Sequence, residues 1–412
     1  MRDGIPEHYL DINAPAFVYD PYPVLADLRE RLPVFYDPVW SKVFFARYDD
    51  IAALLRERRL GRAILHVLSR DELGWPPPNP LTREFDMFQA DHMLDNEPPK
   101  HTRLKGLMLK AFTSSRVEGL RPTIRRIVDG LIDAVADNGQ MDLLEDFAEP
   151  IPVTVIAALL GVPEADRHRL RPWSAAIVKL YELGYTDEQA TAANQAVIEF
   201  SDYIRRLAAD RRRLPRDDLI SALVRVDEQG QTLTEDELVA NCILLLNAGH
   251  EASINGTTLG MLSLHRHPEQ KAAATAAAAR GDAKFFDAAV EELLRYDTPL
   301  PMFERWVLDD FEFRGVPLRR GMEVALLYAS GNRDARRFPD PDRLELTRKD
   351  NPHLTFGLGI HYCIGAPLAR VELQTSFMQL LARLPNIRIA REPVEYAGGF
   401  VIRGHRAMPV EF

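Results

Sequence analysis

The 412-residue sequence contains little cysteine and lacks long hydrophobic runs. Its only cysteines, Cys242 and Cys363, are too few for a disulfide framework and favour a reducing compartment. The most apolar stretches, residues 151–162 and 238–249, are shorter than the roughly 20 apolar residues that cross a bilayer. The N-terminal residues lack the apolar centre of a signal peptide. We therefore expect a cytoplasmic protein without membrane insertion.

The sequence is also short of positive charge. Lys and Arg number 51 against 61 Asp and Glu, which gives a formal net charge of −10. This excess of acid argues against nucleic acid as the main partner, but it does not exclude a local basic patch that docks an acidic protein. Hydrophobic residues make up 46% of the chain, so a sizeable core is available and extensive disorder is not expected.

Helical periodicity dominates the chain, whereas strand signals are few. Apolar residues recur at helical spacing in segments 22–31, 49–57, 101–112, 115–138, 187–213, 217–226, 235–265, 268–279, 284–296 and 367–384. Strand signals occur near 33–48, between 303 and 327, and near 400–411. No repeat or obvious linker interrupts this pattern. We predict a mainly α fold with small β-sheets, organised as a single domain over residues 1–412.

One segment, residues 73–94, does not follow the helical pattern. Its prolines remove backbone donors, which predicts that it contains no regular helix. It also carries Trp75, Phe85, Phe88 and Met93. The segment is therefore interpreted either as a surface connection or as an apolar lid over a ligand.

Cys363 lies among glycines directly before a predicted helix, in "HLTFGLGIHYCIG" (353–365). Unpaired amide donors and the positive end of the helix dipole stabilise a thiolate at such a position. Gly357 and Gly359 permit turns that larger residues forbid, and Gly365 leaves room for a flat group close to the backbone. Two interpretations remain open from chemistry alone: a buried structural cysteine and a thiolate that ligates a metal.

Two other roles for Cys363, as a zinc ligand and as a protease nucleophile, fit the sequence poorly. A structural zinc site needs four ligands, and no second cysteine or nearby histidine pair completes one. A cysteine protease needs a positioned histidine base, and His361 stands only two residues from Cys363 in the sequence. A metal that needs one thiolate from the protein is haem iron.

The segment "FGLGIHYCIG" (356–365) resembles the haem-binding loop of the cytochrome P450 superfamily, Phe-x-x-Gly-x-His/Arg-x-Cys-x-Gly. "EELLR" is similar to the family's Glu-x-x-Arg pair, with Glu292 and Arg295 as its structural residues. The resemblance extends over the whole chain, including segments 95–107, 332–344 and 403–410, and is strongest to soluble bacterial members. It implies the cytochrome P450 fold, in which haem lies between the long central helix and the helix after the cysteine.

The resemblance also implies where oxygen is activated. "NAGHEAS" (247–253) corresponds to the part of the central helix that runs over the iron, with Glu251 at the family's acid position. The next residue is usually threonine, but here it is Ala252 and the hydroxyl moves to Ser253. Because successive helical residues are rotated by about 100°, Ser253 faces away from the position of Ala252.

This departure resembles certain macrolide-hydroxylating members, which keep alanine at this position. Those members are thought to use an ordered water and a substrate hydroxyl as the proton relay. We therefore expect the substrate to carry a hydroxyl or carbonyl group near the carbon that is oxidised.

By resemblance the cofactor is haem b (iron protoporphyrin IX), with Cys363 as the iron ligand. Lys105 stands where the family commonly has arginine, so it offers a point charge without a bidentate fork. The other expected cofactor contacts come from the loop and from propionate-binding positions: Phe356, Gly357, His361, Gly365, His101 and Arg305.

The implied substrate is a hydrophobic small molecule. Asn247 is the polar exception in the expected pocket, interpreted either as a satisfied core amide or as a group that orients an oxygenated substrate. The remaining pocket residues are Leu244, Ala248, Leu300, Met302 and Val401.

Electrons are expected from NAD(P)H through a ferredoxin or flavodoxin and its reductase, because no flavin or iron–sulfur segment is recognisable. Arg103, Lys105, Lys110 and Arg370 are candidates for the docking patch. We expect a monomer that acts as a haem-thiolate monooxygenase. The alternatives are a peroxide-driven haem oxygenase, a haem-dependent ligand-binding protein without turnover, and a helical scaffold in which the cysteine is structural.

Overall fold

The computed structural model describes residues 4–181, 184–227, 230–397 and 399–412. Its packing distinguishes two compact units, each discontinuous in sequence. The first unit comprises residues 1–67, 124–151 and 252–412, and the second comprises 68–123 and 152–251. The division falls within three continuous helices, α7 (Arg121–Val135), α8 (Pro150–Leu160) and α12 (Glu235–Arg266). Organisation as a single domain stays a prediction.

The first unit combines helices with the strands of the protein. Its helices are α1 (Pro15–Tyr19), α2 (Tyr22–Arg31), α3 (Tyr48–Leu54), α13 (Pro268–Ala279), α14 (Ala283–Tyr296), α15 (Tyr328–Gly331) and α16 (Ala366–Arg383), with the shorter η2 (Ala136–Asn138), η3 (Leu143–Ala148) and η6 (Gly359–His361). Its strands are β1 (Val34–Asp37), β2 (Lys42–Phe45), β3 (Leu60–Gly61), β4 (Gln140–Asp142), β5 (Phe303–Val307), β6 (Phe311–Phe313), β7 (Val316–Leu318), β8 (Glu323–Leu326), β9 (Arg388–Ile389) and β10 (Pro409–Glu411).

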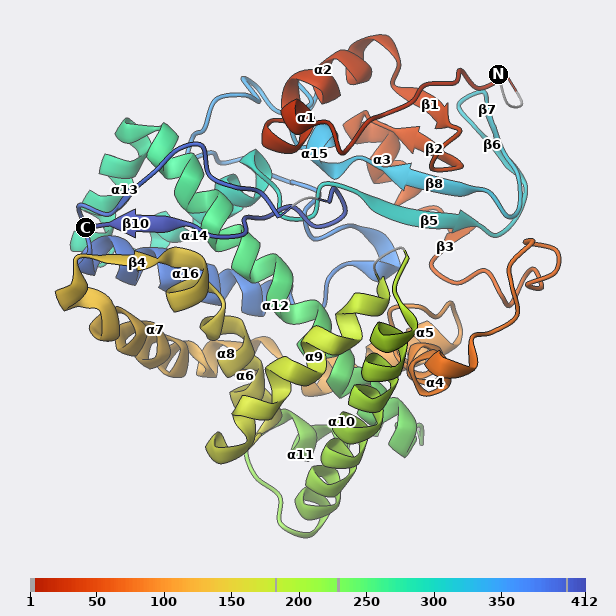
Figure 1. The fold of residues 1–412 in the computed structure, drawn as a ribbon, viewed down its shortest axis with the longest axis horizontal. Coiled ribbons are helices and arrows are strands. Elements are labelled where there is room, and N and C mark those ends of the chain that lie inside the picture. The colour runs from red at the N-terminus through yellow and green to blue at the C-terminus, as the bar shows by residue number, and fades with distance from the viewer. Residues whose placement is uncertain (1–3, 182–183, 228–229, 398) are drawn as a thin grey trace. The chain divides into compact units, whose positions relative to one another are not determined.

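A five-stranded sheet with the order β1-β2-β8-β5-β3 organises the core of the first unit (Figure 1). Side chains of successive strand residues point to opposite faces, so Phe44 joins one hydrophobic cluster and Val43 and Phe45 join another. Phe35 pairs with Phe44 across β1 and β2, and their rings stack 5.0 Å apart. Both faces of the sheet are therefore buried, which explains why these strands read as nearly continuous apolar runs.

Smaller sheets complete the strand content: β4-β10-β9 and the hairpin β6-β7 (Figure 1). The strand signals near 33–48 and 303–327 are confirmed. Near 400–411 only the last part, β10, forms a strand. The predicted mainly α fold with small sheets is confirmed.

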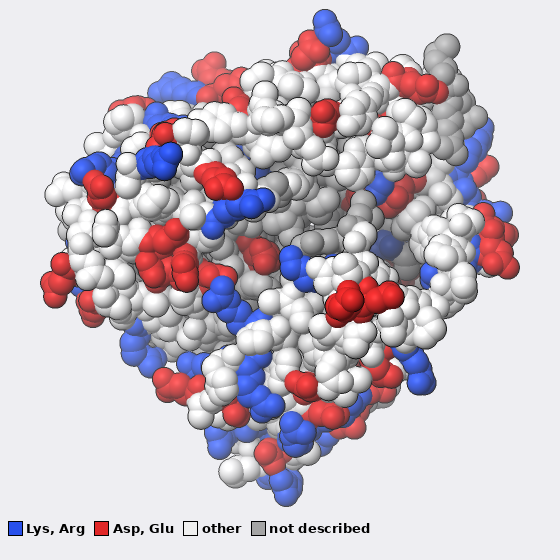
Figure 2. Space-filling model, viewed as in Figure 1, with Lys and Arg blue, Asp and Glu red and all other residues white. Residues whose placement is uncertain are grey.

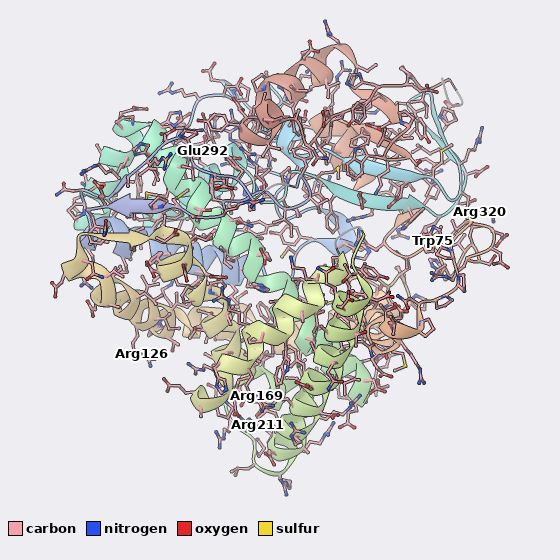
Figure 3. All side chains as sticks on the ribbon, viewed as in Figure 1. Trp75, Arg126, Arg169, Arg211, Glu292 and Arg320 are labelled. Atoms are coloured by element: carbon pink, nitrogen blue, oxygen red, sulfur yellow. The ribbon has the colours of Figure 1, made fainter. Side chains whose placement is uncertain are left out.

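Two residues of α14 belong to a buried ionic network. Glu292 and Arg295 are both fully buried. The Arg295 guanidinium donates from Nε and Nη2 to the Glu292 carboxylate at 2.7 and 2.8 Å (Glu292 is labelled in Figure 3). Its Nη1 donates to the carbonyls of Asn332 and Pro341 at 2.9 and 2.8 Å, and Arg348 Nε donates to Glu292 at 3.1 Å. Every charge in the network thus has a partner, which a fully buried charge requires.

The second unit is helical over the residues that the structure describes. Its elements are α4 (Arg83–Asp91), α5 (Lys100–Ala111), α6 (Ser114–Gly119), α9 (Leu170–Val178), α10 (Asp187–Arg213) and α11 (Leu219–Leu223), with η1 (Pro80–Thr82), η4 (Glu164–Arg169) and η5 (Lys179–Tyr181). A capping box between Thr186 and Gln189 starts α10, and Trp173 of α9 stacks on Phe200 of α10 at 5.1 Å. Arg211, labelled in Figure 3, pairs with Asp218 inside this unit.

Most predicted helices form within one or two residues of their expected limits, and 22–31, 187–213 and 268–279 match their helices fully. The segments 49–57 and 217–226 form shorter helices than expected, α3 and α11. The expectation that 73–94 contains no helix is wrong, because α4 occupies 83–91. The prolines of this segment all precede residue 81, so they limit only its first part. Segment 115–138 divides into α6, α7 and η2.

Four further α-helices, the short α1 and α15 and the longer α8 and α9, were not predicted. The sequence "PIPVTVIAALL" of α8 is apolar on all sides, so no helical periodicity reveals it. Among the described helices, none combines the length and the apolar character needed to span a membrane.

The buried network generates the first prediction. Replacing Arg295 by methionine leaves the Glu292 carboxylate short of its main partner in a fully buried site. We expect the free energy of unfolding to fall by about 3–5 kcal/mol, measured by urea denaturation. The control is Arg383→Met, which removes an ion pair to Asp133 on the surface and should cost less than about 1 kcal/mol. Equal losses in both variants would contradict a central role for the network.

Candidate functional site

Cys363 ends a tight loop in the first unit, directly before α16. The Cys363 amide donates to the Phe356 carbonyl at 3.0 Å, which closes the loop on itself. The cysteine is exposed, in contrast to Cys242, which is fully buried. Burial raises the pKa of the Cys242 thiol to about 12, so that residue is an inert core group. The prediction that Cys363 is the distinctive cysteine agrees with this contrast.

Two glycines give the loop its shape. Gly357 and Gly359 have φ angles of +66° and +73°, in the left-handed region that larger residues disfavour. A Cβ atom on Gly359 would also collide with the carbonyl oxygen of Leu55. The loop therefore needs glycine at 359 for both backbone conformation and space. Gly365 precedes α16, where a Cβ atom would lie 3.7 Å from the Cys363 sulfur, so glycine leaves this side of the thiol uncovered.

Glu291, beside the buried Glu292, holds the two flanks of this loop. Its carboxylate accepts hydrogen bonds from Arg370 of α16 at 2.7 and 2.9 Å and contacts His353 Nε2 at 3.1 Å. Although burial alone would raise it, these two partners lower the pKa of Glu291 to about 2. Arg370 is thus held by an internal ion pair, although the sequence suggested it for a docking patch.

The donor set fits a haem group better than a metal bound by protein alone. No cluster of three or more His, Cys, Asp or Glu residues able to hold a metal occurs among the residues that the structure describes. Because the porphyrin itself supplies four nitrogen ligands to iron, a haem site needs as little as one ligand from the protein, and the exposed Cys363 thiol could supply it. The glycine-rich loop and the uncovered sulfur define a site of the haem-thiolate class.

The residues expected at the propionates are distributed over both units. In the first unit, Arg305 is 4% exposed and lies 5.0 Å from the Phe303 ring, while its Nη1 donates to the Glu304 carbonyl. In the second unit, His101 and Lys105 stand one turn apart on α5, so they share a helix face. His361 lies in η6 of the cysteine loop. Each remains a candidate cofactor contact.

One face of α12 consists of small, open residues. Ala248 and Ala252 are four residues apart, share a face, and are both exposed. Within the second unit, a Cβ atom on Gly249 would approach Ile156 Cδ1 to 2.6 Å, so glycine allows α8 to pack closely there. Leu244 is buried. The open alanine face is the part of α12 that can lie against a flat cofactor or a substrate.

The acid expected on this helix, Glu251, has a side chain that is 41% exposed. The ring of the neighbouring His250 lies close, with Nε2 3.5 Å from Glu251 Oε1. A hydrogen bond with His250 is the main cause that lowers the pKa of Glu251, and burial acts in the opposite direction. Glu251 is therefore a partly open carboxylate with one close titratable neighbour.

Ser253 lies on the buried side of α12, as its rotation from Ala252 predicts. It is 7% exposed, and its hydroxyl hydrogen-bonds to Glu372 of α16 within the first unit. Glu372 is 2% exposed, and burial raises its pKa to about 8. Its other carboxylate oxygen, Oε1, has no partner among the described residues. Ser253 thus contacts a buried carboxyl group instead of occupying the open face of Ala252.

Asn247 has one satisfied and one unsatisfied group. Its Oδ1 accepts a hydrogen bond from the Ser174 hydroxyl of α9 at 2.7 Å. Its Nδ2 is buried and has no partner among the described residues. Asn247 is therefore not a fully satisfied core amide, and a buried donor without an acceptor is costly.

The other expected pocket residues differ in environment. Leu300 is half-buried and packs against the cluster that contains Phe45, whereas Met302 is buried in the cluster that contains Phe44. Val401 is 45% exposed. Their contact with a substrate stays a prediction.

The expected docking patch contains internally paired charges. In the second unit, Arg103 is held by Glu237, and Lys110 approaches the Asp227 carbonyl at 3.4 Å. On the face drawn in Figure 2, acidic and basic side chains are interspersed without a large region of one sign.

Comparison with known proteins agrees with the haem-thiolate assignment. A family model described as Cytochrome P450 matches residues 62–385. Two curated relatives are similar over most of their length. The polyketide biosynthesis cytochrome P450 PksS of Bacillus subtilis is 35% identical, covering 96% of each chain. The mycinamicin IV hydroxylase/epoxidase of Micromonospora griseorubida is 38% identical, covering 92% of this chain and 90% of that protein.

A solved structure gives the same result for the fold. P450BioI, in complex with an acyl carrier protein ligated to hexadec-9Z-enoic acid, has a TM-score of 0.85 and 33% identity, covering 97% of this chain and 100% of that chain. The chain belongs to the cytochrome P450 family and has its fold. It is a cytochrome P450 monooxygenase that uses haem b and electrons derived from NAD(P)H through redox partners.

Sequence reasoning did not find three contacts of this site: Ser174 with Asn247, His250 with Glu251, and Glu372 with Ser253. The histidine next to the acid was visible as a local signal. The other two contacts join residues that are distant in sequence, and no local pattern indicates them.

Glu372 generates the second prediction. Its carboxyl has an ordinary pKa near 4.5 in the unfolded chain and about 8 in the folded protein. Between these values the folded state retains a proton that the unfolded chain has released, so this group makes the free energy of unfolding fall as pH rises. We expect Glu372→Gln to remove a slope of up to about 1.4 kcal/mol per pH unit between pH 4.5 and 8, measured by urea denaturation.

The control is Glu395→Gln, which changes a carboxyl group that is largely exposed. This variant should keep the pH dependence of the parent. An unchanged slope in Glu372→Gln would mean that the buried carboxyl does not bind a proton in the folded protein.

Proposed function

We propose that this chain inserts one oxygen atom from dioxygen into a hydrophobic, oxygen-bearing small molecule of the polyketide type, by hydroxylation or epoxidation. The observation that carries the haem part of this proposal is the exposed Cys363 thiol at the start of α16. We place the enzyme in the cytoplasm, because a haem-ligating thiol must stay reduced. We further propose that it acts as a monomer. Its electron donor is a separate ferredoxin or flavodoxin with its reductase.

The chain's own residues have distinct roles in this proposal. Cys363 would ligate the haem iron, and Phe356, Gly357 and Gly365 would shape the loop around it. Bound haem supplies the activation of dioxygen, and a thiolate ligand favours cleavage of the O–O bond. The groups that would hold the propionates are His101, Lys105, Arg305 and His361.

Proton supply is the step in which this chain departs from its family. Glu251 offers a carboxylate at the edge of the open face of α12, whereas Ala252 has no hydroxyl. Ser253 cannot replace it, because it is buried beside Glu372. We therefore propose that a hydroxyl or carbonyl group of the substrate helps to hold the water that carries protons to the reaction site.

The polar contact available to such a substrate is Asn247. With Oδ1 held by Ser174, Nδ2 is a donor that suits an acceptor oxygen. A polyketide carries such oxygens on an apolar skeleton. The names of two relatives, one in polyketide biosynthesis and one acting on mycinamicin IV, support this substrate class. The carrier-protein complex of P450BioI supports testing substrates that are tethered as thioesters.

An absorbance titration tests the proposed function. The purified holoenzyme is titrated with macrolides and linear polyketides, free and bound to an acyl carrier protein, and with terpenoids, fatty acids and aromatics. A shift from low-spin to high-spin haem with the polyketides, and not with the others, is the expected result. In the control Cys363→Ser, the thiolate-type spectrum should be lost. A shift with another class alone would refute the substrate assignment.

The missing alcohol generates a separate prediction. If a hydroxyl or carbonyl group of the substrate already holds the water that carries protons, the hydroxyl added by Ala252→Thr is redundant. We expect product formed per NAD(P)H consumed to stay equal or fall with the native substrate. A sharp rise in this coupling would show that the relay is not assisted by the substrate. The matched control is Ala248→Ser, which adds a hydroxyl one turn away on the same helix face.

A peroxide-driven oxygenase is the second candidate, because Ala252 weakens proton delivery. The presence of Glu251 argues against it. Product formation with peroxide but not with dioxygen and redox partners would favour this candidate. A haem-dependent binding protein would form no product in either assay.

A further inference from the structure

The ring of His250 is anchored to its own helix. Nδ1 lies 2.8 Å from the carbonyl oxygen of Leu246, one turn earlier in α12. A carbonyl oxygen can only accept a hydrogen bond, so Nδ1 carries a proton in this arrangement. The side chain of His250 is 10% exposed, which limits competition from water for this bond.

The anchor determines which ring nitrogen titrates. With Nδ1 protonated, Nε2 is the atom that gains or loses a proton. Nε2 lies 3.5 Å from Glu251 Oε1. Consecutive side chains on a helix normally diverge by about 100° and do not face each other. Here they meet because the ring of His250 bends back to Leu246, so the contact depends on the anchor.

The pair lies in a field that favours a negative Glu251. The hydrogen bond with His250 lowers the pKa of Glu251 most, burial opposes this effect, and the charges of His250 and Lys179 add to the lowering. Lys179 belongs to η5, which precedes the undescribed residues 182–183. A single proton held by the pair can therefore sit on Nε2, as imidazolium beside carboxylate, or on Glu251, as carboxylic acid beside neutral imidazole.

We propose that His250 is a positioning residue that supplies Glu251 with protons from the side of α12 away from Ala252. When the Glu251 carboxylic acid gives its proton to an acceptor on its open side, it is left as a carboxylate beside neutral imidazole. Nε2 then takes a proton from solvent to form imidazolium, with Nδ1–H still held by the Leu246 carbonyl. The imidazolium passes the Nε2 proton to the carboxylate, which restores the carboxylic acid beside neutral imidazole. This inference rests on the proposed role of Glu251 as the acid.

Nitrogen NMR tests the pair without any turnover. The full-length holoenzyme is labelled at histidine nitrogens and studied as its diamagnetic reduced CO complex, and His250 is identified among the 11 histidines by the signals missing in His250→Asn. We expect the neutral ring to carry its proton on Nδ1. Glu251→Gln should weaken proton binding at Nε2 by about tenfold or more. A neutral ring protonated on Nε2, or proton binding unchanged in Glu251→Gln, would overturn the proposal.

A double-mutant cycle tests the relay. His250→Asn keeps a short side-chain donor that can reach the Leu246 carbonyl and removes Nε2, whereas His250→Phe removes both nitrogens. We expect both variants to lower product per NAD(P)H by roughly tenfold, and His250→Asn to add nothing in a Glu251→Gln background. The control Glu395→Gln, which changes a largely exposed carboxyl group with no role in the site, should leave product per NAD(P)H and its solvent isotope effect unchanged.

The outcomes separate this inference from the proposed function. Loss of coupling in Glu251→Gln but not in His250→Asn would overturn the relay and leave Glu251 as the acid. Full coupling in Glu251→Gln would overturn the acid role in the proposed function, and the relay with it. Additive losses would show that His250 acts independently of Glu251, which also overturns the relay.

Discussion

The cysteine loop depends on two adjacent carboxylates of α14. Glu292 is buried with Arg295 and Arg348 and accepts a hydrogen bond from Asn351 Nδ2 at 3.2 Å. Glu291 binds the next flank, through His353 and Arg370. Glu292 therefore holds the segment that leads into the loop. Glu291 connects this segment, through His353, to Arg370 of α16, which follows the thiol. A single helical turn of α14 thus positions both ends of the loop.

Asn332, whose carbonyl accepts a hydrogen bond from Arg295, also helps to hold the start of the cysteine loop. Its Oδ1 accepts the Leu354 amide at 2.7 Å, while the Thr355 hydroxyl donates to the Leu294 carbonyl at 2.9 Å. Backbone groups that a glycine-rich loop cannot pair within itself are thus satisfied by α14 and by the segment after α15. The exposed thiol of Cys363 is possible because the surrounding loop is held by buried polar bonds and not by packing over the sulfur. This division leaves the face of the thiol open for a flat ligand.

Sequence alone predicted the parts of the molecule whose cause is local. The capping box at Thr186 and the arginines that end at Arg213 define α10, and short, nearly continuous apolar runs form β1 and β2. The loop around Cys363 was recognisable because its glycines and cysteine are contiguous. The helix α4 was missed because a rule about proline was applied to the whole of 73–94, although the prolines end before the helix begins. The contact of Ser253 with Glu372 depends on how α12 packs against α16, which no local pattern encodes.

The central helix separates its chemistry by face. Ala248 and Ala252 leave one side open and without any donor, whereas His250 and Ser253 lie 160° and 100° away by the geometry of the helix, where both are buried. The family's usual alcohol would have belonged to the open side. With Ala252 in its place, the polar groups His250 and Ser253 lie on the buried side of the helix. Glu251 lies at the edge between the open side and the buried side, so it can contact both. In the proposed mechanism, a proton that reaches the open face of this helix comes through Glu251 or from the substrate, and the anchoring of His250 to Leu246 would give the first route a fixed partner.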